Sequence, residues 1–248
     1  MAQLSGIVKH LLIVNGIFFL TTMLFGEPMF DLFALHYFDN PKFHPWQVVT
    51  HMFMHSNQSY FHILFNMLGL WMFGTPLERM WGSKKFLFFY LSTGLGAAAL
   101  QLGIYAFSVT QIHTQLSEFS LTASEIDVFF NTGRLRYGII ESIGEDTLRA
   151  GMEAFNSTMV GASGALYGVL VAFAIFFPNA ELMLLFPPIP IKAKYLVPLL
   201  IVFDLFFGFS SYSVGPIAHF AHVGGAITGL LMMWYWNRNQ FKKNRWDL

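Results

Sequence analysis

A serine in a glycine-rich segment is the first residue of this sequence that could do chemistry. An apolar stretch opens with Gly161, Ala162, Ser163 and Gly164. Ser163 is therefore expected near the N-terminus of a helix, where free backbone N–H groups can face a developing oxyanion. The flanking glycines would let a substrate backbone approach. Small residues also serve helix packing in membranes, so the segment alone leaves both interpretations open.

His222 is the second candidate, because an ionisable side chain inside an apolar helix is costly and by default marks function. Gly225 and Gly229 follow it at offsets of three and seven, on the same helix face. Gly164 and Gly168 form a matching pair after the serine. Two such faces can pack with their backbones very close. Close packing would bring the imidazole to the serine hydroxyl, as a nucleophile and its general base require.

Two polar side chains at the start of another apolar stretch could support this chemistry. His62 and Asn66 are four residues apart and share one face of a helix. Both can donate hydrogen bonds, and donors in a water-poor cavity suit the stabilisation of an oxyanion. The alternative is polar packing between helices.

The composition indicates that these residues lie in a membrane protein. Of the 248 residues, 55% are hydrophobic and 11% are charged, whereas roughly a quarter of a soluble domain is charged. The apolar residues form blocks of about 20, the length that spans a bilayer as a helix. A net charge of zero argues against nucleic-acid partners, and the absence of cysteine excludes disulfides and thiolate metal sites.

We predict an all-α fold, a bundle of six membrane-spanning helices in a single domain over residues 1–248. The predicted spans are 7–25, 61–77, 86–107, 161–177, 195–209 and 218–236. The first block has no obvious small-residue cleavage site and is interpreted as a retained helix. Ten of the fourteen lysines and arginines fall on one side of such an alternating bundle. By the positive-inside rule, both termini are expected in the cytoplasm.

Three connecting segments have distinct character. Residues 27–60 hold amphipathic aromatic material suited to the outer membrane interface. Residues 108–157 form a polar insert on the outer face, where Thr122 and Glu125 fit a capping box and Gly133 could end the helix. A second insert helix is expected over 145–155. In the inner connector 178–194, a stiff extended conformation is predicted from Pro187, Pro188 and Pro190.

The chain resembles the rhomboid family of intramembrane serine proteases across all six predicted spans. The nucleophile motif is matched by Gly161 to Gly164 with Tyr167, and the general-base motif by Ala221 and His222 with Gly225 and Gly229. Further matches are His62 and Asn66 on the oxyanion side, Trp46, Thr50, Phe53 and His55 before the second helix, and Gly74, Leu77, Glu78 and Gly82 at its inner end.

The resemblance implies a Ser163–His222 dyad, with Tyr167 stacked on the imidazole. An oxyanion would be held by the Ser163 N–H, His62 and Asn66. No aspartate is clearly placed to orient His222, and Asp204 is the only candidate acid in the fifth span. The expected substrates are single-span membrane proteins, cut at or near the outer face of a bacterial plasma membrane. No cofactor or metal is expected, and the oligomeric state stays open.

Three departures from the family pattern stand out. Gln47 follows the loop tryptophan where arginine is usual, which puts the polar anchor of this loop in doubt. Six residues separate His55 from His62, where four are usual. The insert at 108–157 is longer than in the minimal family member.

Other functions stay open at this level. An intramembrane metalloprotease is disfavoured, because the motif His-Glu-x-x-His is absent. In a transporter or channel, Asp204 and His222 would line a proton path. A catalytically inactive scaffold of the same fold would bind helices without cutting them. For a protease, His51, His55 and His219 are candidates to line the water-filled cavity.

The predicted topology can be tested by labelling, because the chain has no cysteine of its own. The Ser124→Cys variant should react with an impermeant thiol reagent added to intact cells, whereas Ser83→Cys should not. The reverse pattern would overturn the topology and the side from which water enters.

Overall fold

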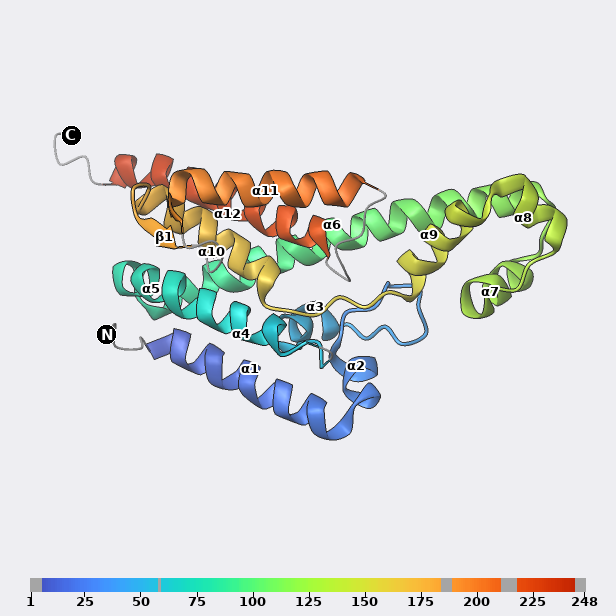
Figure 1. The fold of residues 1–248 in the computed structure, drawn as a ribbon, viewed down its shortest axis with the longest axis horizontal. Coiled ribbons are helices and arrows are strands. Elements are labelled where there is room, and N and C mark those ends of the chain that lie inside the picture. The colour runs from blue at the N-terminus through green and yellow to red at the C-terminus, as the bar shows by residue number, and fades with distance from the viewer. Residues whose placement is uncertain (1–5, 58, 184–188, 211–217, 244–248) are drawn as a thin grey trace.

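The protein is described by a computed structural model covering residues 6–57, 59–183, 189–210 and 218–243. Almost all of its regular structure is helical (Figure 1). The helices at the predicted spans are α1 (Gly6–Phe25), α4 (Tyr60–Gly69), α5 (Thr75–Trp81), α6 (Ser83–Glu118), α10 (Ser163–Phe176), α11 (Ala193–Phe209) and α12 (His219–Lys243). The connecting segments carry α2 (Glu27–Phe33), α3 (Gln47–Thr50), η1 (His51–Phe53), α7 (Ala123–Thr132), α8 (Tyr137–Ile143) and α9 (Glu145–Asn156).

Each predicted span coincides with a helix or a run of helices. The second span is α4 and α5 joined by η2 (Leu70–Gly74), a π-helical turn that keeps the chain helical throughout. The two largest differences from the predicted ends are that α6 continues from 107 to Glu118 and that α12 continues past 236 to Lys243. Both extensions carry polar residues, which marked the ends of the apolar blocks and not the ends of the helices.

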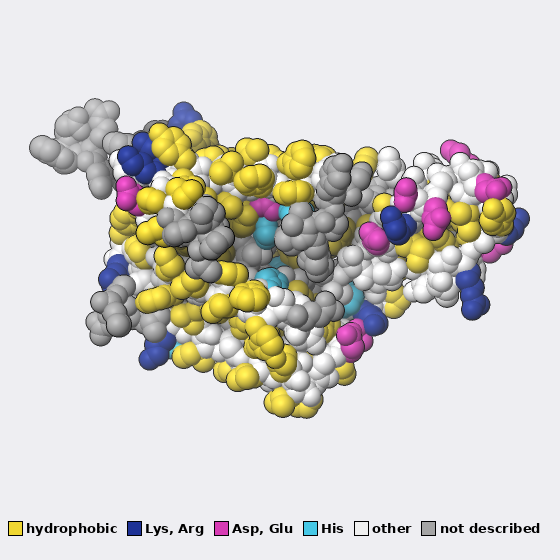
Figure 2. All heavy atoms as spheres, in the orientation of Figure 1, with side chains coloured by type: hydrophobic (Ala, Val, Ile, Leu, Met, Phe, Trp, Pro, Cys, Tyr) yellow, Lys and Arg dark blue, Asp and Glu magenta, His cyan; other side chains and the backbone are white. Residues whose placement is uncertain are grey.

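Two of the described helices are long and apolar enough by themselves to cross a membrane. These are α1 and α6, while α10 is a shorter apolar helix. Figure 1 places both ends of the described chain, the α5–α6 junction and β1 at one end of the bundle, and the insert at the opposite end. In Figure 2, hydrophobic side chains cover much of the visible face of the bundle, and basic side chains lie at both ends, mixed with acidic side chains at the end that carries the insert.

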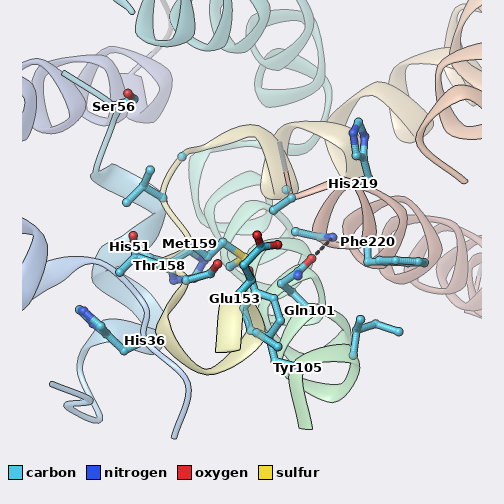
Figure 3. A pocket seen from close by; sticks show the side chains of 18 of the residues that line it. His36, His51, Ser56, Gln101, Tyr105, Glu153, Thr158, Met159, His219 and Phe220 are labelled. Atoms are coloured by element: carbon cyan, nitrogen blue, oxygen red, sulfur yellow. Dashed lines mark hydrogen bonds between the residues drawn. The ribbon is translucent and has the colours of Figure 1, made fainter. Parts of the chain in front are cut away.

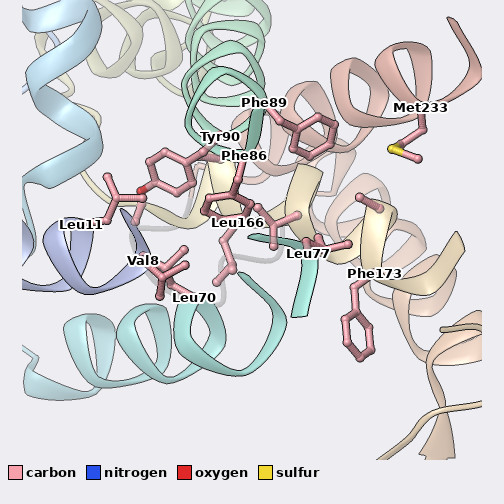
Figure 4. Packing of buried hydrophobic residues seen from close by; sticks show 14 of the residues in the cluster. Val8, Leu11, Leu70, Leu77, Phe86, Phe89, Tyr90, Leu166, Phe173 and Met233 are labelled. Atoms are coloured by element: carbon pink, nitrogen blue, oxygen red, sulfur yellow. The ribbon is translucent and has the colours of Figure 1, made fainter. Parts of the chain in front are cut away.

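A core of aromatic and aliphatic side chains holds the bundle together. Fully buried members from α1, η2, α5, α6 and α10 pack against one another (Figure 4). They include Val8, Leu70, Leu77, Phe86, Phe89, Tyr90 and Val169. The Glu78 carboxylate of α5 accepts hydrogen bonds from the backbone N–H groups of Ile7 and Val8. Because a helix N-terminus favours negative charge, Glu78 fixes the start of α1 against this core.

The insert is an ordered helical unit with a hydrophobic core of its own. This core joins the end of α6 to α7, α8 and α9 through Ile112, Leu116, Phe129, Phe130 and Phe155, among others. The predicted capping box at Thr122 is confirmed, as is the left-handed Gly133 that ends α7. Hydrogen bonds from the Thr122 backbone and hydroxyl hold the pKa of Glu125 below its usual 4.5. The cap therefore adds stability above that pH and loses it as the pH falls through the lowered pKa.

The connector before α11 differs from the prediction. It contains a two-stranded antiparallel hairpin of β1 (Glu181–Met183) and β2 (Pro190–Lys192), while the fold as a whole is mostly helical, as predicted. Pro190 sits at the start of β2, a position where its missing N–H is tolerated. Pro187 and Pro188 lie outside the described residues. The hairpin ends where Ala193 donates to the Ala180 carbonyl and α11 begins.

Glycines set the distance between α10 and α12. A Cβ placed on Gly225 would collide with the Gly164 carbonyl, and one on Gly229 would lie 2.7 Å from the Gly168 Cα. This is the backbone contact that the glycine spacing predicts. On the far side of α10, the Thr93 hydroxyl of α6 donates to the Ala165 carbonyl at 3.2 Å. The helix that begins at Ser163 is therefore held from two sides.

We expect the Gly225→Ala variant to unfold at a lower temperature in detergent. The added methyl group must push α12 away from the α10 backbone, and overpacking of this kind costs about 1–3 kcal/mol. Gly16→Ala in α1 is the matched control, because nothing lies within 4 Å of a Cβ there. Equal unfolding temperatures for the two variants would contradict the close contact.

Candidate functional site

Ser163 is the first residue of α10, with Ala162 as the N-cap residue. The chain reaches it through Gly161, whose φ of 122° disfavours any other residue. A Cβ at Gly161 would lie 2.9 Å from His62 Nε2 and 3.6 Å from Ser163 Oγ. The Gly161 N–H donates to the His51 carbonyl at 2.9 Å, which ties this turn to η1. The serine hydroxyl thus lies at a helix N-terminus, next to Gly161, where the lack of a side chain leaves space beside the hydroxyl.

The structure brings His222 to Ser163 from a separate helix. His222 Nε2 lies 2.8 Å from Ser163 Oγ, within hydrogen-bonding distance. The Tyr167 ring stacks on the imidazole with centroids 4.3 Å apart and planes only 9° apart. Tyr167 is one turn after Ser163, so the same helix presents the hydroxyl and the stacking ring. The ring plane of His222 is fixed by this contact and by the hydrogen bond together.

An aspartate also reaches His222, which corrects the sequence prediction. Asp204 Oδ1 of α11 lies 3.0 Å from His222 Nδ1 and 2.7 Å from His219 Nδ1. Sequence reasoning named Asp204 and found no clear placement for it. A usable signal was present: Ala193, Val197 and Asp204 recur at helical spacing and are the buried residues of α11. Such spacing puts the carboxylate on the face that packs against α12.

His62 and Asn66 lie on the other side of the serine. The Ser56 N–H donates weakly to His62 Nδ1 at 3.4 Å, which leaves Nε2 directed toward Gly161. Asn66 Nδ2 donates to the His62 carbonyl at 2.7 Å, so one of its two N–H groups is already used. Its Oδ1 is buried and has no hydrogen-bond partner among the described residues. Both side chains line the same cavity as Ser163.

One cavity joins these residues. Its lining includes Ser163, His222, His62, Asn66, His51 and His219, together with residues from the loop before α4 and from α9. Figure 3 shows His36, His51 and Ser56 on one wall and Gln101, Tyr105 and His219 on another. Histidine side chains are visible in a hollow at the centre of the face in Figure 2.

The three histidines predicted to line the cavity differ in position. His51 and His219 line the cavity, whereas His55 is fully buried and packs edge-on against the His62 ring at 5.2 Å. Burial lowers the pKa of His51 to about 4 and that of His55 to about 3. Both side chains of this loop are therefore neutral at physiological pH, and His55 serves packing.

Gln47 anchors the loop before α4 in place of the arginine that the family pattern uses. Its buried amide donates to the carbonyls of Asp31 and Lys42 at 2.9 Å each, and its oxygen accepts from the His36 N–H at 3.3 Å. The Thr50 hydroxyl adds a hydrogen bond to the Phe33 carbonyl at 2.8 Å. These hydrogen bonds hold the loop against α2, together with the ion pair between Lys42 Nζ and Asp31 Oδ1 at 2.8 Å.

Further support for α12 comes from α6. Gln101 Oε1 accepts a hydrogen bond from the Ala221 N–H at 3.1 Å, drawn as the dashed line in Figure 3. The first turn of a helix has backbone N–H groups without helical partners, and Gln101 satisfies one beside His222.

Within the described residues, Asp204, His219 and His222 form a group of metal-ligand types whose ligand atoms lie within 4.8 Å of one another. In the structure these atoms bond to each other, with one aspartate oxygen between two imidazole nitrogens.

The comparisons with known proteins identify the class. A family model described as Rhomboid domain matches residues 42–239, most of the chain. The chain therefore belongs to the rhomboid family and is an integral membrane protein.

Individual relatives agree with this assignment. The mitochondrial Rhomboid protein 1 of Saccharomyces cerevisiae is 24% identical over 180 residues, which cover 73% of this chain and 39% of that protein. Rhomboid protease AarA of Providencia stuartii is 27% identical over 194 residues, 75% of this chain and 54% of that protein. Rhomboid protease GlpG of Klebsiella pneumoniae is 37% identical over 75 residues, 30% of this chain and 26% of that protein.

The relatives also bear on the expected location. This chain spans about two fifths and about half of the length of the yeast and Providencia proteins. The names of several relatives place them in mitochondria or chloroplasts. The comparisons therefore support a membrane location in general and do not support the bacterial plasma membrane in particular.

Proposed function

We propose that this protein is an intramembrane serine protease with Ser163 as nucleophile and His222 as general base. The observation that carries the proposal is the 2.8 Å contact between Ser163 Oγ and His222 Nε2, made by side chains of two separate helices. A nucleophile and a base at this distance are the requirement for hydroxyl activation. The names of relatives such as AarA and GlpG, both rhomboid proteases, support the same reaction class.

In the proposed reaction, Ser163 Oγ attacks the carbonyl carbon of the scissile peptide bond. Its proton moves to His222 Nε2, and the imidazolium returns that proton to the leaving amine. Water then enters through the cavity and hydrolyses the acyl-enzyme, with His222 again accepting the proton. The stacked Tyr167 ring keeps the imidazole in one plane throughout.

Three donors are proposed to hold the oxyanion. The Ser163 N–H lies at the start of α10, where backbone N–H groups have no helical partner. His62 Nε2 borders the same glycine as the serine hydroxyl. Asn66 retains one amide N–H beyond its bond to the His62 carbonyl. Donors aimed at charge that develops during reaction stabilise the transition state more than the substrate.

The membrane arrangement is part of the proposal. We place α1, α4–α5, α6, α10, α11 and α12 across the bilayer, with both termini in the cytoplasm and the insert outside. Large apolar side chains on the outward faces of these helices are exposed, among them Ile17, Leu20, Phe206, Phe209, Leu230 and Leu231. Such a surface is stable against lipid and costly in water. Substrates would be single-span membrane proteins cut at or near the outer face.

Two other functions remain as outcomes of the test. In a proton-coupled transporter, the Asp204–His222 pair would carry protons and Ser163 would have no chemical role. In an inactive scaffold, the same bundle would bind helices without cutting them. A serine-reactive fluorophosphonate probe separates these from a protease, because only an activated serine reacts with it.

Replacing either member of the pair should abolish cleavage. Ser163→Ala and His222→Ala remove the nucleophile and the base and add little strain, so both variants should still insert and purify. Cleavage of model single-span substrates, read by mass spectrometry, checks this result. Cutting by Ser163→Ala would sink the serine mechanism. Chelators should leave wild-type activity unchanged, and activity lost in chelator but restored by zinc would favour a metalloprotease.

Asn66→Ala should lower turnover roughly 10²- to 10³-fold, the usual effect of losing one oxyanion donor. Residual activity should exceed that of Ser163→Ala, because His62 and the backbone donor remain. Affinity for an uncleaved substrate should change little, since a ground-state carbonyl is the weaker acceptor. Turnover is compared for wild type, Asn66→Ala and His62→Ala, with affinity measured on the Ser163→Ala background. An equal loss of affinity and turnover would return Asn66 to a packing role.

A further inference from the structure

Asp204 is the one acidic side chain buried among the described residues of α11. Its exposed fraction is 5%, while its neighbours Phe203 and Phe206 are 50% and 59% exposed. The carboxylate therefore points into the bundle from a helix whose other face is apolar. A charge in such a position is costly unless it is bonded, and by default it marks function.

The partners of the carboxylate are two imidazoles. Oδ1 accepts from His222 Nδ1 at 3.0 Å and from His219 Nδ1 at 2.7 Å. Oδ2 is buried, and the Tyr167 hydroxyl is a third polar neighbour that interacts with this carboxylate. Both histidine bonds connect α11 to α12 through side chains. The contacts connect the carboxylate to the histidine that faces Ser163.

This arrangement fixes the tautomer of His222. A carboxylate oxygen can only accept a hydrogen bond, so the ring nitrogen beside it must carry the proton. With Nδ1 protonated, Nε2 of the neutral ring has a free lone pair. That nitrogen is the one 2.8 Å from Ser163 Oγ. The opposite tautomer would present an N–H to the serine and could not take its proton.

We propose that Asp204 is a positioning residue that holds His222 in the tautomer able to accept the Ser163 proton. The inference rests on the proposed serine protease function and extends its dyad to a chain of three residues. During the attack the proton moves from Ser163 Oγ to His222 Nε2. Asp204 takes no proton and stays a carboxylate, and its negative charge stabilises the imidazolium.

His219 takes part in the same arrangement from the other side. Its Nδ1 donates to the same oxygen, and its ring packs near Phe207 at 5.8 Å. A carboxylate oxygen has two lone pairs, so both hydrogen bonds can form at once. His219 thereby holds the carboxylate in place from the first turn of α12, one turn before His222.

The first test compares the rates at which a fluorophosphonate probe labels Ser163. Asp204→Asn keeps the volume but removes the charge, and loss of the aspartate typically costs soluble serine proteases roughly 10⁴-fold in turnover. We expect labelling and kcat to fall by roughly 10²-fold or more, with KM nearly unchanged. Asn15→Leu in α1 is the matched control, since Asn15 is also fully buried and lies in another helix. It should alter stability without altering the labelling rate.

The second test reads the tautomer directly by ¹⁵N NMR of histidine-labelled protein, with the His222 signal identified by its loss in His222→Ala. Wild type should show Nδ1–H, and Asp204→Asn should show a larger share of Nε2–H. This readout does not depend on catalysis, so a purely structural role would leave it unchanged. An unchanged tautomer or an unchanged labelling rate in Asp204→Asn would overturn the proposal.

Two further variants separate the possible failures. If His219→Phe lost as much labelling as Asp204→Asn, the carboxylate would act through His219, and the proposed role would be wrong. If wild type were labelled at Ser163 and Asp204→Asn reacted equally fast, the positioning role alone would fail. Absence of both cleavage and labelling in wild type would instead reject the proposed function.

Discussion

The contact between the α10 and α12 backbones is the constraint on which the rest of the site depends. Gly164 and Gly225 leave no room for a side chain at the crossing. Membrane helices gain little from hydrophobic burial against one another, so such packing supplies much of their association. Because Ser163 and His222 lie within one turn of this crossing, the separation of the two helices sets the length of the hydrogen bond between them. A methyl group at the crossing would therefore lengthen that hydrogen bond.

Neighbouring elements hold this crossing from outside. Thr93 of α6 bonds to the backbone of α10, and Gln101 of the same helix bonds to the start of α12. The two contacts are two turns apart on α6, so one rigid helix positions both halves of the candidate site. The loop before α4 adds the third side, through the bond between His51 and Gly161. The helices that carry Ser163 and His222 are thus held in place by α6, and α10 is also held by the loop before α4.

Local patterns in the sequence were enough to predict much of the fold and part of the candidate site. Apolar blocks gave the long helices, and Thr122, Glu125 and Gly133 gave the boundaries of α7, because caps are local chemistry. Helix ends were misjudged where polar residues continue a helix beyond the apolar block, as in α6. The hairpin before α11 was missed because strands of three residues leave almost no periodic signal.

In the candidate site as well, contacts within one helix were predicted from the sequence, whereas some contacts between separate elements were not. Spacing on one helix predicted that His62 and Asn66 lie together and that Tyr167 follows Ser163 by one turn. The partner of His222 Nδ1 depends on how α11 is rotated against α12, which no single segment encodes. The role of Gln47 was equally hidden, since its three backbone partners come from separate points of the loop.

Because α6 is one continuous helix, the rotation of its residues about the helix axis fixes how the insert is oriented relative to the bundle. This helix runs for 36 residues, about 54 Å, and packs on α10 near one end and on α9 near the other. Each residue of an α-helix turns the chain by about 100°. Adding or deleting one residue between the two packing zones would therefore swing Ile112 away from Gly151, and with it the whole core of the insert. The angular position of residues around α6 therefore determines which side of the insert faces the cavity.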